Sequence, residues 1–307
     1  MTSNNSLITI VGPTAIGKTA LSIQLAKHFK ANIISCDSRQ FYKEMTIGTA
    51  VPETDELSAV KHHFIQNRSI FDDYNVGEFE RDALSKLGEL FKENPIQIMV
   101  GGSGLYVDAV LKGLDYFPEV DPEIRDKLNQ ELETKGLLYL QEKLKKLDLE
   151  TYNTIEIENH KRVTRALEVC IGSGIPYSTF KNKTKAPRNF NIIKIGLNAD
   201  REIIYSRINQ RVDIMIKNGL IEEASEIYQH KKLNALQTVG YRELFSYFDK
   251  KISKEFAISE IKKNTRRFAK RQLTWFKKDE NTLWFNYLTD IHTIITKVSD
   301  KINIAKR

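Results

Sequence analysis

The stretch GPTAIGKT occupies residues 12–19 and directly follows the apolar run LITIV at residues 7–11. It fits the pattern G-x-x-x-x-G-K-[ST], in which backbone N–H groups and the N-terminus of the following helix surround phosphate groups. Glycines at both ends of the pattern let the backbone approach a ligand closely. The stretch therefore predicts a strand, a phosphate-binding loop and a helix, in that order, with a di- or triphosphate as ligand.

The residues of this loop also predict a metal ion. Lys18 adds a positive charge beside the phosphates, and the hydroxyl of Thr19 is suited to Mg²⁺. We therefore expect Mg²⁺ as a cofactor, with Thr19 as its protein ligand. The pattern does not specify the reaction and is equally compatible with ATP-dependent phosphoryl transfer. The candidate phosphate-binding residues are Gly12, Thr14, Ala15, Ile16, Gly17, Lys18 and Thr19.

The fold class follows from what surrounds the loop. Apolar, β-branched runs at residues 32–35, 96–100 and 192–197 predict further buried strands, and residues 18–30 have helical periodicity. A strand, a helix and a second strand in succession build a parallel α/β sheet. We therefore expect an α/β protein with a P-loop NTPase-like parallel sheet flanked by helices. The expected parts are a first section of the core at 1–117, a helical insertion at 118–190, and a return to the core with C-terminal helices at 191–307.

Composition limits the class of protein and of partner. The net charge is +7, and residues 261–278 hold eight Lys or Arg and no acid. This distribution favours a contact with a phosphate backbone, although charge runs more often mark a solvated helix face. The two cysteines provide no disulfide framework. There is no signal-peptide pattern and no apolar run of transmembrane length, so we expect a cytoplasmic protein without a membrane partner.

Polar residues follow two of the predicted strands. SCDSRQFY at residues 35–42 follows the second strand, whose carboxyl end lies beside the phosphate loop in a parallel sheet. Asp37 could act as a general base or hold Mg²⁺ through water, and Ser38 and Gln40 could hydrogen-bond a planar base. GGSGLY at residues 101–106 places the Ser103 hydroxyl at the same edge. The alternative is that both are strand-end turns without a ligand.

The order of the motifs resembles that of the tRNA dimethylallyltransferases, the bacterial tRNA isopentenyltransferase family. The resemblance covers about residues 12–276 and departs at two positions: Val51 stands where the family usually has Lys, and Ser103 where it usually has Thr. The matching stretches are GPTAIGKT, SCDSRQFY, MTIGTA, GGSGLY, NHKRVTRALEV, LQTVGYRE and RRFAKRQLTWF.

This resemblance implies a reaction and roles for residues. The implied reaction is transfer of a dimethylallyl group from dimethylallyl diphosphate to N6 of the adenosine just 3′ of the tRNA anticodon. Asp37 then corresponds to the base, Ser103 to a hydroxyl shared between diphosphate and nucleotide, and Arg211 to an arginine that supports the transition state. Tyr241 and Arg242 correspond to stacking and phosphate-contacting residues. The residues implied to contact tRNA are Asp37, Ser38, Arg39, Gln40, Arg125, Lys161, Arg162, Arg165, Gly240, Tyr241 and Arg242.

Two other classes of protein are compatible with the loop and the charge. One is a P-loop kinase for a small molecule or nucleotide, with the helical insertion as its lid. The other is a non-catalytic P-loop protein that binds RNA. The transferase hypothesis predicts tRNA and dimethylallyl diphosphate as partners, and we expect a monomer.

Overall fold

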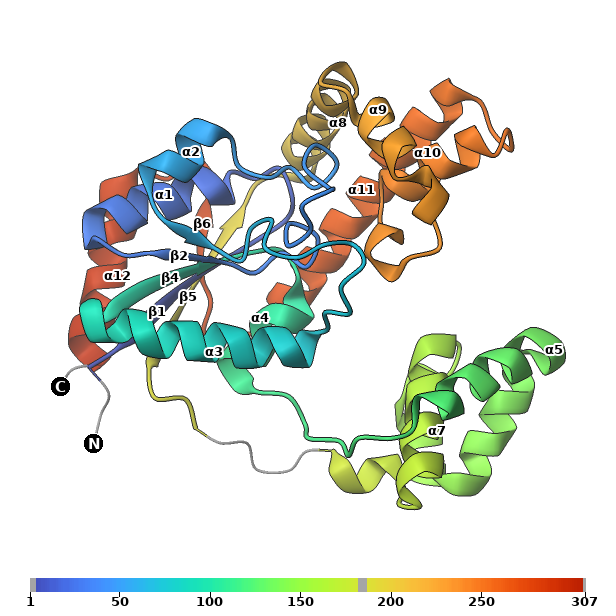
Figure 1. The fold of residues 1–307 in the computed structure, drawn as a ribbon. Helices are drawn as coiled ribbons and strands as arrows, with labels where there is room; N and C mark the ends of the chain where they lie inside the picture. The colour runs from blue at the N-terminus through green and yellow to red at the C-terminus, as the bar shows by residue number, and fades with distance from the viewer. Residues whose placement is uncertain (1–3, 182–186, 306–307) are drawn as a thin grey trace. The chain divides into compact units, whose positions relative to one another are not determined.

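The protein carries a six-stranded, fully parallel sheet with the strand order β3-β2-β4-β1-β5-β6 (Figure 1). The computed structural model describes residues 4–181 and 187–305. The four predicted strands are present, whereas β3 and β6 lie in stretches for which no strand was predicted. The strands are β1 (Ser6–Val11), β2 (Ile33–Ser35), β3 (His62–His63), β4 (Ile96–Val100), β5 (Asn191–Asn198) and β6 (Leu283–Asn286).

Alternate residues of the central strands face opposite sides of the sheet, as a parallel sheet covered on both faces requires. In β1, Ile8 and Ile10 belong to one apolar cluster, and Leu7 and Val11 belong to another. The first cluster includes residues of α1 (Lys18–Phe29), α12 (Ile291–Ala305) and the start of α8 (Arg201–Lys217). The second includes residues of α3 (Val76–Glu93) and α4 (Gly104–Lys112).

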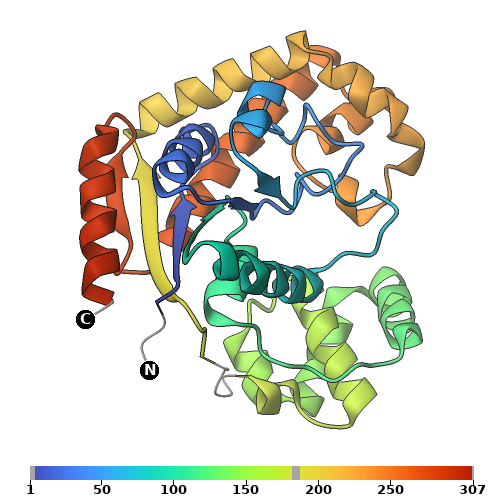
Figure 2. The same cartoon turned by 60° about the vertical axis from the view of Figure 1, so that its left-hand side comes forward.

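A third apolar cluster joins the C-terminal helices to the segment that follows β2. Figures 1 and 2 show α8 leaving the end of β5 toward this cluster and α11 (Lys254–Phe276) returning from it. The cluster includes Met45, Leu236 and Tyr241. Many of its other residues come from α9 (Leu220–Glu226), α10 (Tyr241–Phe248) and the single turns Tyr228–His230 and Asn234–Leu236 that lie between them. The short helix α2 (Thr54–Ala59) contributes no residue to this cluster.

A second compact unit, Gly113–Ala186, is helical and has its own apolar core. The insertion predicted at 118–190 has nearly these limits. Its long helix is interrupted at Gly136, where φ is 79°, and the last helix ends at Gly174 with a left-handed residue. The elements are α5 (Pro122–Leu147), α6 (Leu149–Thr154), α7 (His160–Ser173) and a single turn at Tyr177–Phe180.

No helix in the described part of the chain combines the length and the apolar composition needed to cross a membrane.

Candidate functional site

Three loops meet at the carboxyl edge of the sheet. In register, Ile10 of β1 lies beside Val100 of β4, and Val100 lies beside Ser35 of β2, so the three strands end at the same level. The loops that follow them are residues 12–17, 36–42 and 101–103. Ligands of parallel α/β proteins bind at this edge, at the point where successive strands run to opposite sides. Here that point is β1, since β2 lies on its β4 side and β5 pairs with it on the other.

The phosphate loop has the expected backbone. Gly17 precedes α1 with a φ of 108°, and α1 begins at Lys18. The Lys18 ammonium donates a 2.8 Å hydrogen bond to the Pro13 carbonyl. Arg207 of α8 also reaches the loop, donating from Nε to the Ala15 carbonyl at 2.7 Å. Two cations therefore hold the loop through its carbonyl oxygens.

Two cavities open at this edge of the sheet. The phosphate-loop cavity has a volume of about 770 Å³, and the α11 cavity has a volume of about 330 Å³. The phosphate-loop cavity is lined by residues 14–20 and by most of the segment 46–57, without Gly48 and Asp55. The α11 cavity is lined by Ser38, Ser103, residues 237–240 and the side of α11 that carries Phe268. Both volumes lie in the range typical of small-molecule sites.

Asp37 and Arg211 line both cavities, together with Thr14, Thr49, Ala50 and Met215. The cavities therefore meet at a carboxylate and a guanidinium. A group bound on the phosphate loop and a group bound in the α11 cavity would face each other there. Asp37 and Arg211 are two of the three residues that the resemblance implies for catalysis, and the third, Ser103, lines the α11 cavity alone.

Burial lowers the pKa values of two cations at the junction, Lys18 and Arg211. Burial and the nearby Arg211 lower the pKa of Lys18 to about 8, against the opposing pull of Asp37. Burial and the neighbouring Arg207 lower the pKa of the Arg211 guanidinium as well. Burial removes much of the hydration that stabilises a charged group, so an anionic ligand would stabilise the charged forms of these two cations.

A pH dependence follows for the free protein. Lys18 is charged below a pH of about 8 and loses its charge above it. A bound anion favours the charged form, so binding takes up a proton at higher pH. The dissociation constant for inorganic pyrophosphate should therefore rise above pH 8, by up to about tenfold per pH unit. Calorimetric titrations at pH 7, 8 and 9 would measure it. Lys18→Met should lose this part of the pH dependence; equal slopes in the two proteins would contradict the assignment.

Gln272 on α11 joins the phosphate loop to the loop after β4. Its Oε1 accepts the Thr14 N–H at 2.8 Å, and its Nε2 donates to the Gly102 carbonyl at 2.9 Å. A Cβ on residue 102 would lie 2.3 Å from that Nε2, so a side chain there would displace the Gln272 amide. The Gln272 side chain is buried, and no sequence pattern marks it because it lies within a stretch dominated by cations.

We expect Gln272→Met to break the link between the phosphate loop and the loop after β4. The change leaves one N–H and one carbonyl without their partner, which should lower stability by about 1–3 kcal/mol. The apparent affinity for the phosphate-bearing substrate should fall by about tenfold because the loop is no longer fixed. Thermal unfolding and steady-state kinetics would measure both effects. The exposed Gln24→Met on α1 is the matched control; a Gln272 variant that behaves like it would disprove the role.

The loop after β2 has an internal network that includes Ser103. The Ser38 N–H donates to Ser103 Oγ at 3.1 Å, and the two hydroxyls are also 3.1 Å apart. Asp37 Oδ1 accepts the Arg39 N–H at 3.1 Å. Ser38 and Ser103 thus form a pair of hydroxyls on the wall of the α11 cavity, next to Asp37.

Three residues predicted to contact tRNA have other partners in the structure. Gln40 donates its amide N–H groups to the carbonyls of Thr49 and Ala50, at 3.2 and 2.8 Å. Arg39 donates to the carbonyls of Asn234 and Ala235, at 3.1 and 3.0 Å. Tyr241 has no exposed surface, so the prediction that its ring stacks on RNA is wrong. Its neighbours Gly240 and Arg242 do line the α11 cavity.

The basic residues predicted on the helical unit have acidic neighbours. Arg125 and Arg165 both form ion pairs with Glu168, at 2.6 and 3.1 Å, and Arg162 pairs with Glu156 at 3.3 Å. All three side chains are more than a third exposed. Lys161 lies beside them on the exposed surface of α7. Their contact with tRNA stays a prediction.

The basic stretch at residues 261–278 comprises the C-terminal part of α11 and the two residues after it. Lys262 pairs with Asp213 at 2.6 Å, and Lys263 pairs with Glu260 at 2.8 Å. Arg266 donates to Asn209. The beginning of the stretch is thus partly neutralised by α8 and by α11 itself. Arg271, by contrast, lines the α11 cavity with its guanidinium 5.8 Å from the centre of the Phe268 ring.

Comparison with known proteins identifies the family to which this chain belongs. A family model described as IPP transferase matches residues 40–279. The tRNA dimethylallyltransferase of Flavobacterium johnsoniae is 63% identical over 302 residues, which cover 96% of this chain and 98% of that protein. The chain belongs to the IPP transferase family.

Solved structures of IPP transferases have the same fold. The full-length tRNA isopentenylpyrophosphate transferase of Bacillus halodurans superimposes with a TM-score of 0.74 at 35% identity and covers 98% of both chains. A eukaryotic dimethylallyltransferase described as acting on tRNA superimposes with a TM-score of 0.80 at 25% identity, over 97% of this chain and 77% of that one.

Two departures from the usual IPP transferase pattern can now be placed. Val51 lines the phosphate-loop cavity, so this member presents an apolar side chain where a lysine is usual. Ser103 retains the hydroxyl of the usual threonine and uses it toward Ser38.

Proposed function

We propose that this IPP transferase transfers the dimethylallyl group of dimethylallyl diphosphate to N6 of the adenosine 3′-adjacent to the tRNA anticodon. The products are N6-dimethylallyladenosine and diphosphate. One observation carries the proposal: a phosphate-loop cavity and a second cavity meet at Asp37 and Arg211. The relatives are named as transferases of this kind, which favours transfer over the kinase and over a non-catalytic RNA-binding protein.

The phosphate loop would hold the leaving group. As the bond from the allylic carbon to oxygen breaks, negative charge grows on the departing diphosphate. The amides at the start of α1, the Lys18 ammonium and Arg211 are positioned to stabilise that charge. No phosphoryl group is transferred in this reaction. The loop acts only on the leaving group.

Asp37 would serve the nucleophile. The adenine N6 forms a bond to the allylic carbon and must lose a proton, which the Asp37 carboxylate can accept. The hydroxyls of Ser38 and Ser103 line the same cavity and can orient the base. Because an adenine in a stacked loop cannot reach this position, the base must be extruded into the α11 cavity.

The residues of the phosphate-loop cavity fit Mg²⁺. Thr19 lines it, and Mg²⁺ commonly takes one or two protein ligands with substrate phosphates and water completing the shell. No cage of three or more His, Cys, Asp or Glu side chains occurs among the described residues, and a phosphate-bound ion does not need one. Mg²⁺ bound there would neutralise charge on the diphosphate.

The setting of the reaction is also part of the proposal. tRNA would contact Arg242 and Arg271 at the mouth of the α11 cavity, and would also contact the exposed basic residues of α7. The free and buried cysteines Cys36 and Cys170 suit a reducing, cytoplasmic location. We expect the protein to act as a monomer.

Nucleoside analysis tests this function. The purified protein is incubated with unmodified tRNA, Mg²⁺ and dimethylallyl diphosphate, and the tRNA is then digested and examined by mass spectrometry. The proposal predicts adenosine heavier by one C5 unit at a single position, beside the anticodon. Turnover of ATP without that product would favour a kinase. Binding of tRNA with neither product would favour the non-catalytic alternative.

A further inference from the structure

The segment Thr46–Ala50 separates the two cavities. Thr46 and Ile47 line the phosphate-loop cavity, Gly48 lines the α11 cavity, and Thr49 and Ala50 line both. The segment is a turn without regular secondary structure, and Ala50 has a φ of 51°. A wall of this kind needs support from outside, since its own backbone bonds are few.

Glu223 of α9 supplies that support. Its Oε2 accepts the N–H groups of Thr46 and Ile47 at 2.9 and 2.7 Å, and its Oε1 accepts the Gly48 N–H at 2.9 Å. Three successive amides that converge on one side form an anion site, and here the protein fills it with its own carboxylate. Charge-assisted bonds of this kind are shorter and stronger than neutral ones.

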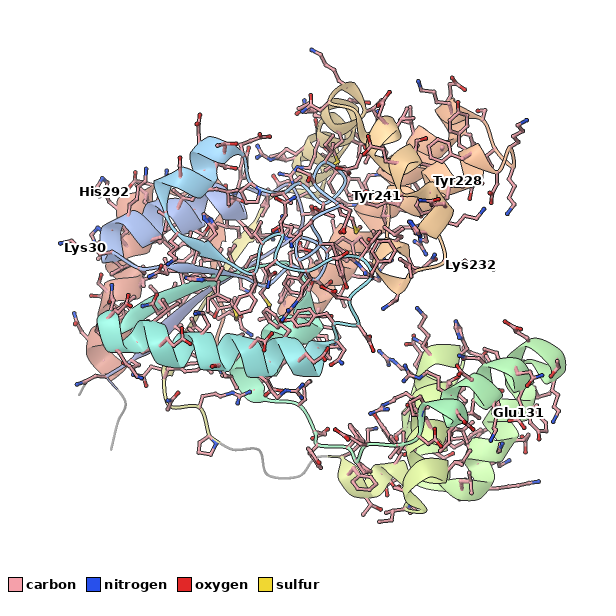
Figure 3. All side chains as sticks on the ribbon, in the orientation of Figure 1. Lys30, Glu131, Tyr228, Lys232, Tyr241 and His292 are labelled. Carbon is pink, nitrogen blue, oxygen red and sulfur yellow. The ribbon has the colours of Figure 1, made fainter. Side chains whose placement is uncertain are left out.

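Tyr241 completes the arrangement from α10. Its hydroxyl donates to the same Oε1 of Glu223 at 2.6 Å. Its ring packs directly against Gly48, where an added Cβ would lie 2.6 Å from the ring and its hydroxyl. Figure 3 shows Tyr241 between α10 and the segment that follows β2. The segment is therefore fixed by one carboxylate and one aromatic ring, and the ring is the one that the sequence had assigned to RNA.

On the opposite side, Gln40 holds the end of the same segment. Its Nε2 donates to the Thr49 and Ala50 carbonyls, and its Oε1 accepts the Ser35 hydroxyl at 3.2 Å. Gln40 lies three residues after Asp37 on the same loop. The position of the wall is thereby tied both to the C-terminal helices and to the loop that carries the junction carboxylate.

We infer that Glu223 is a positioning residue for the transfer reaction, because it holds Thr46–Ala50 in place as the wall between the two cavities. This inference rests on the proposed function for its kinetic consequence, and on the structure alone for the hydrogen bonds. Glu223 does not line either cavity and is not expected to touch a substrate. A displacement of the wall by about 1 Å is enough to reduce turnover by about 100-fold.

The test compares Glu223→Gln with Glu226→Gln, the same change at an exposed position of the same helix. Glu223→Gln places an amide N–H₂ against backbone donors. We expect a kcat lower by about 10- to 100-fold, with the dissociation constant for inorganic pyrophosphate within about threefold of the wild type. Hydrogen exchange of the peptide containing residues 46–48 should be at least about tenfold faster. Glu226→Gln should change none of these quantities.

Two outcomes overturn the inference. Exchange at residues 46–48 that is unchanged in Glu223→Gln would show that the carboxylate does not hold the segment, whether or not the protein is a transferase. A kcat equal to that of Glu226→Gln, in a preparation whose wild type is active, would show that the wall does not matter for turnover. A wild type that yields no C5-adenosine defeats the proposed function instead, and the exchange result still decides the structural claim.

A second variant tests the inference if Glu223→Gln does not fold. Tyr241→Phe retains the ring against Gly48 and removes only the hydroxyl bond to Glu223. It should fold, show faster exchange at residues 46–48, and lose turnover by a smaller factor, about two- to fivefold. Unchanged exchange and turnover in this variant would also count against the inference.

Discussion

Asp37→Ala should lower the rate of transfer by orders of magnitude while tRNA binding survives. If the carboxylate accepts the proton from N6, its removal should lower kcat by about 10²–10⁴-fold. Asp37 lines both cavities, whereas most of the residues proposed to contact tRNA lie elsewhere, so tRNA binding should be largely retained. Single-turnover kinetics would give the rate, and a filter-binding titration would give the affinity for tRNA.

Asp37→Asn removes the basicity of the carboxylate while keeping a side chain of the same size and shape. The amide oxygen can still accept the Arg39 N–H that Asp37 Oδ1 accepts at 3.1 Å, but the group no longer takes up a proton. We expect a loss of turnover similar to that of Asp37→Ala. Asp55→Ala, an exposed change on α2, should have no effect. Normal turnover in Asp37→Asn would exclude the carboxylate as the base.

Lys18→Met should have the second-largest effect. The change removes a buried positive charge from the leaving-group side of the junction and preserves an unbranched side chain of similar length. Loss of one such stabilising group typically lowers the rate by about 10²–10³-fold. The loss should appear in kcat, because charge on the diphosphate is greatest in the transition state.

Lys27→Met is the control, since Lys27 is exposed on the same helix. The rate of transfer with a saturating concentration of dimethylallyl diphosphate distinguishes the two. A Lys18→Met protein with normal kcat and only a raised KM would show that Lys18 binds the substrate without stabilising the departure of its diphosphate.

The strand-loop-helix core could be predicted because its signals are local. Residues 7–11 and 96–100 are apolar, β-branched and bounded by turn residues, and both are strands in the structure. The helix at residues 18–30 follows from periodicity. By contrast, β3 is two residues long and β6 is bordered by polar residues, so each owes its conformation to pairing with a neighbour.

The junction could be predicted in part. Sequence patterns indicated Asp37 and Ser103 because each follows a strand at the edge where β1 meets its neighbours. Gln272 and Glu223 carry no such signal, since both lie on helices and act on backbone groups far away in the sequence, 258 residues away for Thr14 and 175 for Gly48. Arg207 could have been noticed, because it lies one helical turn before Arg211.

Tyr241 shows why a motif can mislead about a role. The stretch LQTVGYRE was expected to face RNA, and Gly240 and Arg242 do line a cavity. Between them the Tyr241 side chain points into the apolar cluster of the C-terminal helices. Burial also raises its pKa, with Glu223 adding to the effect, so the hydroxyl remains a hydrogen-bond donor throughout the accessible pH range. The direction of the Tyr241 side chain is set by the packing of α10 against α9, which cannot be predicted from the sequence pattern.

The central claim is that the phosphate loop holds a leaving group and transfers no phosphate. The most direct measurement is the stoichiometry of the reaction with tRNA, in which inorganic pyrophosphate and C5-modified adenosine are quantified in the same samples. The account predicts one pyrophosphate released for each modified adenosine, with no orthophosphate and no phosphorylated RNA. Release of orthophosphate in step with turnover, or a phosphate group appearing on the acceptor, would contradict it.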